Sequence, residues 1–250
     1  VKSLVNKNTK CIIPVHLFGN ASQMNQLCKF AKSKNIKVIE DAAQGVGVKV
    51  DNKHVGTFGD LGILSFYGNK TVTCGEGGII LTENDKLAER CYQLKNHGRS
   101  KKGVFVHETI GFNFSFTEMQ AAIGLSQLDK LEKIVEIKKT IYKKYCEAFK
   151  NIEEICIPED IKNIDSVMWM SYFFFKNRED IEMHLKTKEI QSRKFFYPLH
   201  LQPCYKDFPS LKKDGDYSNS ISLYNHGLCL PSSVLMTEDQ QETVIKEVIK

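Results

Sequence analysis

The stretch Lys37-Val-Ile-Glu-Asp-Ala-Ala-Gln44 decides how this chain folds. A short apolar run ends on two acidic residues, which is typical of a buried strand that continues into a loop. The first half of the chain repeats this rhythm, because short β-rich runs alternate with segments of helical periodicity. The order strand, helix, strand predicts an α/β sheet with parallel strand pairs.

The elements around this strand follow from the same patterns. Before it, residues 11–16 predict a strand and residues 22–33 a helix. Pro14 counts against the first strand, since a proline donates no hydrogen bond to a ladder. After it, residues 64–66 and 78–81 predict two further strands. Another helix is expected from residue 84 to about residue 96.

A long helical pattern connects this half to a region with a different pattern of apolar and polar residues. Thr117 and Gln120 fit a capping box, and apolar residues then recur every three or four positions to Lys150. This stretch exceeds a usual globular helix, so we expect it to be kinked or to bridge two domains. We predict a large domain over residues 1–150 and a smaller α/β domain over residues 151–250.

The smaller domain is predicted from four shorter patterns. Residues 168–175 form a very apolar strand and residues 179–187 a short helix. Residues 195–197 read as another extended piece. Thr237 and Gln240 predict a capped final helix that reaches Lys250.

Composition places the chain among ordinary globular proteins. Of 250 residues, 42% are hydrophobic and 26% charged, which excludes a disordered or fibrous chain. The net charge of +5 arises from interspersed basic and acidic residues, so we expect no nucleic-acid partner. No apolar run approaches the roughly 20 residues of a membrane helix. The eight cysteines form no CxxC pair, which favours reduced thiols in a cytoplasmic protein.

Metal binding is not expected. The histidines outside the clusters discussed below show neither helical HxxxH spacing nor a cysteine partner. They are His54, His97, His107, His184 and His226.

Two clusters carry side chains suited to chemistry. Asp41 follows a strand directly, and ligands of open α/β sheets bind at the carboxyl ends of strands. Lys70 is framed by Gly68 and by Gly75-Glu-Gly-Gly78, which allow close approach of a backbone to a ligand. Taken separately, a capping acid and a surface lysine are the simpler interpretations. The Walker and GxGxxG nucleotide patterns both fail here.

Taken together, the two clusters fit pyridoxal phosphate chemistry. That cofactor needs a lysine amine for a Schiff base and an acid beside its pyridinium nitrogen. The acid keeps the ring nitrogen protonated, so that the ring accepts electrons. Lys70 follows Asp41 by 29 positions, with a strand between them.

The whole sequence resembles the nucleotide-sugar aminotransferases of the DegT/DnrJ/EryC1/StrS family, which have the fold-type I architecture. That fold is a mixed, mostly parallel sheet flanked by helices, with a smaller carboxyl-terminal α/β domain. The matching stretches occur in family order through most of the chain. They are Pro14–Gly19, Glu40–Gln44, Ser65–Lys70, Gly75–Gly78, Gly111–Ser115, Ala121–Gly124 and Pro198–Pro203.

The resemblance implies a role for each matching cofactor residue. Lys70 matches the Schiff-base lysine, which also moves the proton between cofactor and substrate carbons. Asp41 matches the partner of the pyridinium nitrogen, and Gln44 the residue that bonds the phenolic oxygen. Ser65 matches a phosphate ligand. Asn113 matches an asparagine that reaches the cofactor phosphate of the neighbouring subunit, so a homodimer with shared sites is expected.

Two histidines are candidates for the substrate. The resemblance places His200 near the sugar. His16 is expected close to the site, where a structural role is at least as fitting as substrate binding.

One departure concerns the amino end. The chain begins inside the sheet pattern without a first strand–helix unit, so we expect a fragment. The family carries there a phosphate-binding loop and an aromatic residue that stacks on the cofactor ring.

We therefore predict a pyridoxal-phosphate aminotransferase for polysaccharide or related sugar synthesis. It would move an amino group from an amino acid, glutamate in the family, to a nucleotide-linked keto-deoxysugar. The sequence around Lys70 is most similar to 4-aminotransferases of the perosamine or viosamine kind. This resemblance predicts that the amino group is added at carbon C4 of the sugar. Two alternatives stay open. The family's sugar dehydratases carry histidine in place of the lysine, which Lys70 disfavours, and a truncated, inactive binding subunit would fit the missing amino end.

Overall fold

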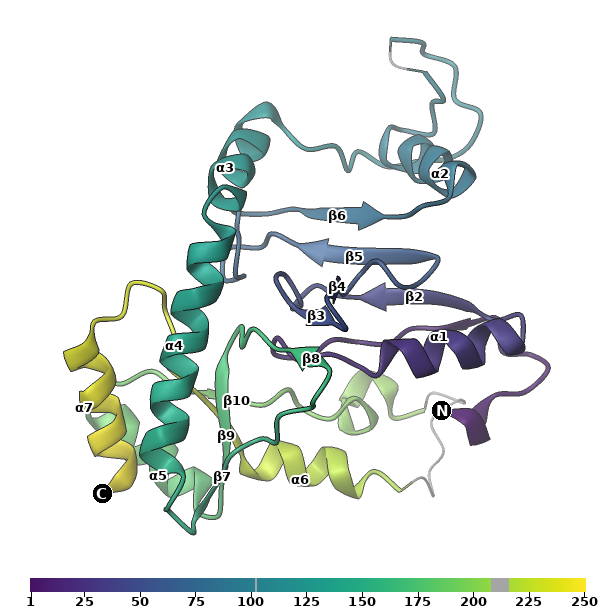
Figure 1. Cartoon of the computed structure of the whole chain (residues 1–250). Helices are drawn as coiled ribbons and strands as arrows, with labels where there is room; N and C mark the ends of the chain where they lie inside the picture. The colour runs from purple at the N-terminus through teal and green to yellow at the C-terminus, as the bar shows by residue number, and fades with distance from the viewer. Residues whose placement is uncertain (102, 208–215) are drawn as a thin grey trace. The chain divides into compact units, whose positions relative to one another are not determined.

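A computed structural model describes residues 1–101, 103–207 and 216–250 (Figure 1). The chain forms two compact units. The first comprises residues 1–136 and 161–169, and the second residues 137–160 and 170–250. The chain therefore changes unit three times, and the boundary predicted near Asn151 lies inside the second unit.

The first unit is built on a four-stranded sheet of order β1-β2-β5-β6. The first three strands are parallel, as predicted, and β6 runs antiparallel to β5. Their bounds are Cys11–Ile12 for β1, Lys37–Asp41 for β2, Leu61–Ser65 for β5 and Gly78–Leu81 for β6.

The first strand is shorter than predicted. β1 ends at Ile12, because Pro14 has no N–H group for the ladder. Beyond it, Val15 forms a single parallel bridge with Asp41. Helix α1 (Met24–Ser33) runs alongside β2 (Figure 1) and buries Met24 and Ala31.

A small sheet in the first unit was missed by the sequence analysis. Strands β3 (Lys49–Val50) and β4 (Lys53–His54) form a hairpin, and β8 (Ile164–Asp165) pairs with β3. The turn residues Asp51 and Asn52 have φ of 48° and 64°, the left-handed conformation that Asp and Asn tolerate. The Asp-Asn dipeptide, a common turn pair, is the sequence signal that could have predicted the hairpin.

The helices of the middle region begin where the sequence predicts. Helix α2 spans Asp85–Lys95, and its cap Asn84 accepts a hydrogen bond from the Leu87 N–H. The predicted long helix is two helices, α3 (Glu118–Leu128) and α4 (Leu131–Phe149). Helix α4 begins in the first unit and continues into the second.

The second unit contains an antiparallel sheet of order β10-β11-β9-β7. The strands are β7 (Ile155–Cys156), β9 (Ser171–Phe175), β10 (Arg193–Lys194) and β11 (Gly227–Leu230). The helices of this unit after α4 are α5 (Arg178–Thr187), α6 (Ser218–His226) and α7 (Glu238–Ile249). The predicted capping box of Thr237 and Gln240 is present at α7.

The short 3-10 helices complete the described elements. They are Lys2–Leu4, Leu199–Leu201 and Pro203–Tyr205.

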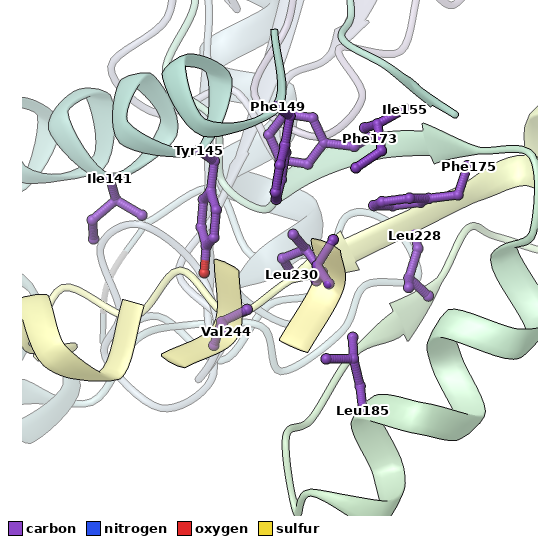
Figure 2. Close-up of a cluster of buried hydrophobic side chains, with 11 residues drawn as sticks. Ile141, Tyr145, Phe149, Ile155, Phe173, Phe175, Leu185, Leu228, Leu230 and Val244 are labelled. Carbon is purple, nitrogen blue, oxygen red and sulfur yellow. The ribbon is translucent and has the colours of Figure 1, made fainter. Parts of the chain in front are cut away.

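Aromatic residues of α4 and β9 form the core of the second unit (Figure 2). Phe149 and Phe173 have no exposed surface, and their rings meet edge to face with centroids 5.0 Å apart. The apolar spacing along α4 therefore serves packing, since it presents Tyr145 and Phe149 to the sheet.

None of the helices in the described part of the chain is both long enough and apolar enough to cross a bilayer.

We expect Phe173→Ala to destabilise the full-length protein by about 3–5 kcal/mol, because it opens a cavity in a core that cannot collapse fully. Urea unfolding checks this value. Met183→Ala on the exposed face of α5 is the control, with an expected change within about 0.5 kcal/mol. Equal losses for both variants would contradict the assigned core.

Candidate active site

The carboxyl ends of β2 and β5 lie at the same edge of the first unit's sheet. The two strands are parallel neighbours, with Asp41 opposite Ile63. Asp41 ends β2 and Ser65 ends β5. The sheet therefore brings the two predicted clusters to one edge, which is where open α/β sheets bind ligands.

A buried carboxylate fixes the end of β2. Glu40 has no exposed surface, and its Oε1 accepts hydrogen bonds from the backbone N–H groups of Phe58 and Gly59. Its Oε2 accepts from the Gly56 N–H at 2.7 Å and lies 3.2 Å from His16 Nε2. A buried charge needs such partners, since an unpaired one is costly.

The His16 ring is oriented by its second nitrogen. The Ser22 backbone N–H donates to Nδ1 at 3.2 Å, so Nε2 carries the proton and donates to Glu40. His16 has no exposed surface and both ring nitrogens are engaged. This geometry supports the structural role, one of the two that the sequence left open.

The hydrogen bonds keep Glu40 ionised. Burial alone would raise the pKa of the Glu40 carboxyl, but the bonds from His16 and from three backbone N–H groups outweigh burial. The pKa therefore lies below its ordinary value.

Asp41 is oriented by the same strand end. Its N–H donates to the Pro14 carbonyl at 2.9 Å, and its carbonyl accepts from the His16 N–H at 3.0 Å. On the side chain, Oδ1 accepts from the Ala43 N–H at 3.1 Å. The second oxygen, Oδ2, is therefore the one suited to an external partner such as a protonated ring nitrogen.

Gln44 is locked in one amide orientation. Its Oε1 accepts from the Phe18 backbone N–H at 2.7 Å. The Nε2 group is then left as the donor, which is the correct end for an anionic phenolic oxygen. Phe18 itself has a left-handed φ of 56°, so this contact accompanies an uncommon backbone conformation.

Lys70 lies on a loop that is tied at both ends. The Phe66 N–H donates to the Gly77 carbonyl at 2.8 Å, and the Cys74 N–H donates to the Phe66 carbonyl at 3.0 Å. Lys70 closes a tight turn through its own N–H to the Tyr67 carbonyl. Val72 and Cys74 of this loop are buried in a small core. The loop that carries the half-buried Lys70 is therefore anchored.

Ser65 also points toward this loop. Its Oγ accepts a 3.3 Å hydrogen bond from the Tyr67 N–H. The hydroxyl proton can then be donated to an anion, which suits a phosphate ligand.

Trp169 connects the two clusters. Its ring lies against the Lys70 amine, with Nζ 3.9 Å from the ring centroid. The same ring stacks on Phe18, whose backbone N–H donates to Gln44 Oε1. A contact path thus runs from Gln44 through Phe18 and Trp169 to Lys70.

Three residues of this arrangement are not predicted by the sequence patterns. One is Glu40, for which a signal exists, because an acid that alternates with Val38 on a buried strand face requires a partner. Phe18 and Trp169 gave no comparable signal, because their contacts depend on segments far apart in the chain.

The two remaining predicted residues have other surroundings. Asn113 is exposed on the segment after α2, where its backbone bridges Asn96 and its neighbours Phe112 and Phe114 stack on each other. His200 belongs to the second unit and stacks on Tyr217, with ring centroids 4.1 Å apart.

The donor set fits pyridoxal phosphate. Lys70, Asp41, Gln44 and Ser65 supply an amine, a carboxylate oxygen, an amide donor and a hydroxyl at the ends of β2 and β5 and in the loops that follow them. The carboxylate and the amide are each fixed by a bond to the backbone. This is the chemistry that the aldehyde, ring nitrogen, phenolic oxygen and phosphate of that cofactor require.

The model of the DegT/DnrJ/EryC1/StrS aminotransferase family matches residues 1–249, and the chain belongs to this family. The mixed α/β architecture predicted from the sequence is confirmed.

Three relatives illustrate the similarity. GDP-perosamine synthase of Escherichia coli O157:H7 is 37% identical over 244 residues, 96% of this chain and 65% of its own length. The dTDP-4-amino-4,6-dideoxy-D-glucose transaminase of Shigella dysenteriae is 29% identical and covers 99% of this chain and 68% of its own. A crystal structure of a family aminotransferase from Brucella abortus, 33% identical, superposes with a TM-score of 0.89 over 96% of this chain and 64% of that one.

The chain thus spans about two thirds of the length of these relatives.

We expect Glu40→Gln to destabilise the full-length protein by about 3 kcal/mol at neutral pH, since it breaks a buried charge network. Because the native pKa of Glu40 is lowered, its stabilising contribution is present above the ordinary value of 4.5 and is lost as pH falls through the native pKa. The difference between wild type and variant should therefore shrink in acid. Urea unfolding at several pH values measures this difference.

Glu83→Gln, at an exposed position, is the control and should change little at any pH. A Glu40→Gln difference that stays constant into acid would contradict the assigned network.

Proposed function

We propose that the protein is a pyridoxal-phosphate aminotransferase that acts on a nucleotide-linked keto-deoxysugar. The observation that carries this proposal is the path from Gln44 to Lys70 beside the oriented Asp41 carboxylate. Family membership and the sugar aminotransferases among the relatives support the same activity.

The cofactor residues have distinct tasks in this proposal. When bound, pyridoxal phosphate supplies an aldehyde that carries the amino group and a ring that accepts an electron pair. Asp41 would keep the ring nitrogen protonated through Oδ2, and Gln44 would donate from Nε2 to the phenolic oxygen. Lys70 would hold the cofactor by its aldehyde, with release of water, and its amine, when free, would carry the proton that the amino transfer requires. Ser65 would donate to the phosphate.

We propose that the amino group is added at carbon C4 of the sugar. The sugar in the name of the Shigella relative carries its amino group at C4, and GDP-perosamine synthases are among the similar relatives. We propose glutamate as the amino donor from the family resemblance, and His200 as a sugar contact on the same ground.

We also propose a homodimer in which Asn113 reaches the partner's cofactor phosphate. The segment 104–128 around Asn113 exposes an unusual number of large apolar side chains, which favours burial against another chain. These residues are Val104, Phe105, Val106, Ile110, Phe112, Phe114, Phe116, Met119, Ile123, Leu125 and Leu128.

The compartment that we propose is the cytoplasm. All eight cysteines are free thiols in the structure, which suits a reducing environment.

Borohydride reduction of the full-length protein with pyridoxal phosphate should leave a covalent pyridoxyl adduct on Lys70, identified by peptide mass spectrometry. Lys70→Ala should lose the adduct and amination of a GDP-linked 4-keto-6-deoxysugar. Lys49→Ala, at an exposed lysine of β3, is the control and should retain both. An adduct on another lysine in the wild type would refute the assignment.

Ile110→Glu should convert the dimer to a monomer, because it places a charge in an apolar interface. Sedimentation velocity of the full-length protein measures the change. Leu235→Glu is the matched control, since Leu235 is 86% exposed and Ile110 is 88% exposed. A dimer that survives Ile110→Glu, or dissociates equally in the control, would contradict the proposed interface.

A further inference from the structure

The single tryptophan of the sequence makes two contacts with the turn that carries Lys70. The indole Nε1–H donates to the Asn69 carbonyl, and the face of the ring lies 3.9 Å from Lys70 Nζ. One side chain therefore contacts both the backbone and the amine of this turn, from a position 100 residues further along the chain.

The tryptophan is itself firmly placed. The exposed fraction of Trp169 is 4%, and its backbone N–H donates to the Phe18 carbonyl at 3.0 Å. Its ring stacks on Phe18 with an interplanar angle of 18°. The indole is therefore a rigid surface rather than a side chain that follows the lysine.

A glycine permits this placement. The Val167 N–H donates to the Gly19 carbonyl at 3.0 Å. A Cβ atom at Gly19 would lie 1.9 Å from the Val167 carbonyl oxygen and 2.5 Å from the Trp169 nitrogen. Gly19 also has a φ of 90°, which few other residues adopt. Close approach of these two segments thus brings the indole to Lys70.

The contact favours one protonation state of the amine. An ammonium over an aromatic face is attracted by the ring quadrupole, whereas a neutral amine is not. The bond to the Asn69 carbonyl satisfies a buried N–H, which packing alone would also require, but the contact with Nζ is additional to that requirement.

We propose that Trp169 is a positioning residue for Lys70. Its indole anchors the turn through Asn69 and keeps the Lys70 ammonium in one place until the cofactor aldehyde arrives. Its significance for catalysis rests on the proposed function, but the positioning itself is a property of the cofactor-free protein.

The test is pulsed reductive methylation of the cofactor-free full-length protein with formaldehyde and cyanoborohydride. Peptide mass spectrometry then gives a rate for each lysine. Only the neutral amine reacts, so Trp169→Leu should raise the Lys70 rate roughly 5-fold at about pH 7.5, within the 2- to 30-fold range of such contacts. At about pH 11, where lysines are largely neutral, the two rates should converge.

Trp169→Phe separates the two contacts, because it keeps a ring but removes the Nε1–H donor. Its Lys70 rate should lie between wild type and Trp169→Leu, and it is the variant to use if Trp169→Leu fails to fold by circular dichroism. Lys53, whose Nζ lies 4.8 Å from the Phe58 ring centroid, is the internal control and should keep its rate.

Two results would overturn the proposal. An unchanged Lys70 rate in both variants would show that the ring does not act on the amine. An equal increase at both pH values would show that the ring only shields the amine from reagent. Neither result depends on cofactor trapping at Lys70, so a failure of the proposed function is measured separately.

Discussion

The buried carboxylate of Glu40 is the interaction on which the candidate site depends. It accepts hydrogen bonds from the His16 ring and from the backbone N–H groups of Gly56, Phe58 and Gly59. These bonds join the chain after β1, the end of β2 and the approach to β5 at one point. Since a buried charge without partners is strongly unfavourable, the three segments have little freedom to separate. Asp41 is the next residue, so the backbone that carries its carboxylate is held in place by the same bonds.

From that point the site is assembled by backbone contacts rather than by long flexible side chains. Asp41 and Gln44 each use one oxygen to accept a bond from a backbone N–H, and each therefore turns a defined polar atom outward. Lys70 is longer and more mobile by nature, and the indole of Trp169 supplies the surface that its own loop lacks. Rigid placement of this kind reduces the reorganisation that chemistry would otherwise require.

Much of this could be predicted from the sequence, for physical reasons that differ between elements. Parallel pairing followed from strand–helix alternation, and the caps at Thr117 and Thr237 followed from local spacing. The length of the helical pattern predicted a kink or a bridge between domains, but not the position of the break near Asp129, because no proline or glycine marks that position. The role of Trp169 was also out of reach, since its partners Phe18 and Lys70 come from separate segments that only the folded sheet brings together.

In the proposed site, one carboxylate and one amine serve the same cofactor ring. The most direct measurement is the ¹⁵N chemical shift of the ring nitrogen in ¹⁵N-labelled pyridoxal phosphate bound to the full-length protein. The account predicts a protonated ring nitrogen in the wild type and an unprotonated one in Asp41→Asn, with the label covalently attached to Lys70 in both. The same shift in both proteins would contradict it.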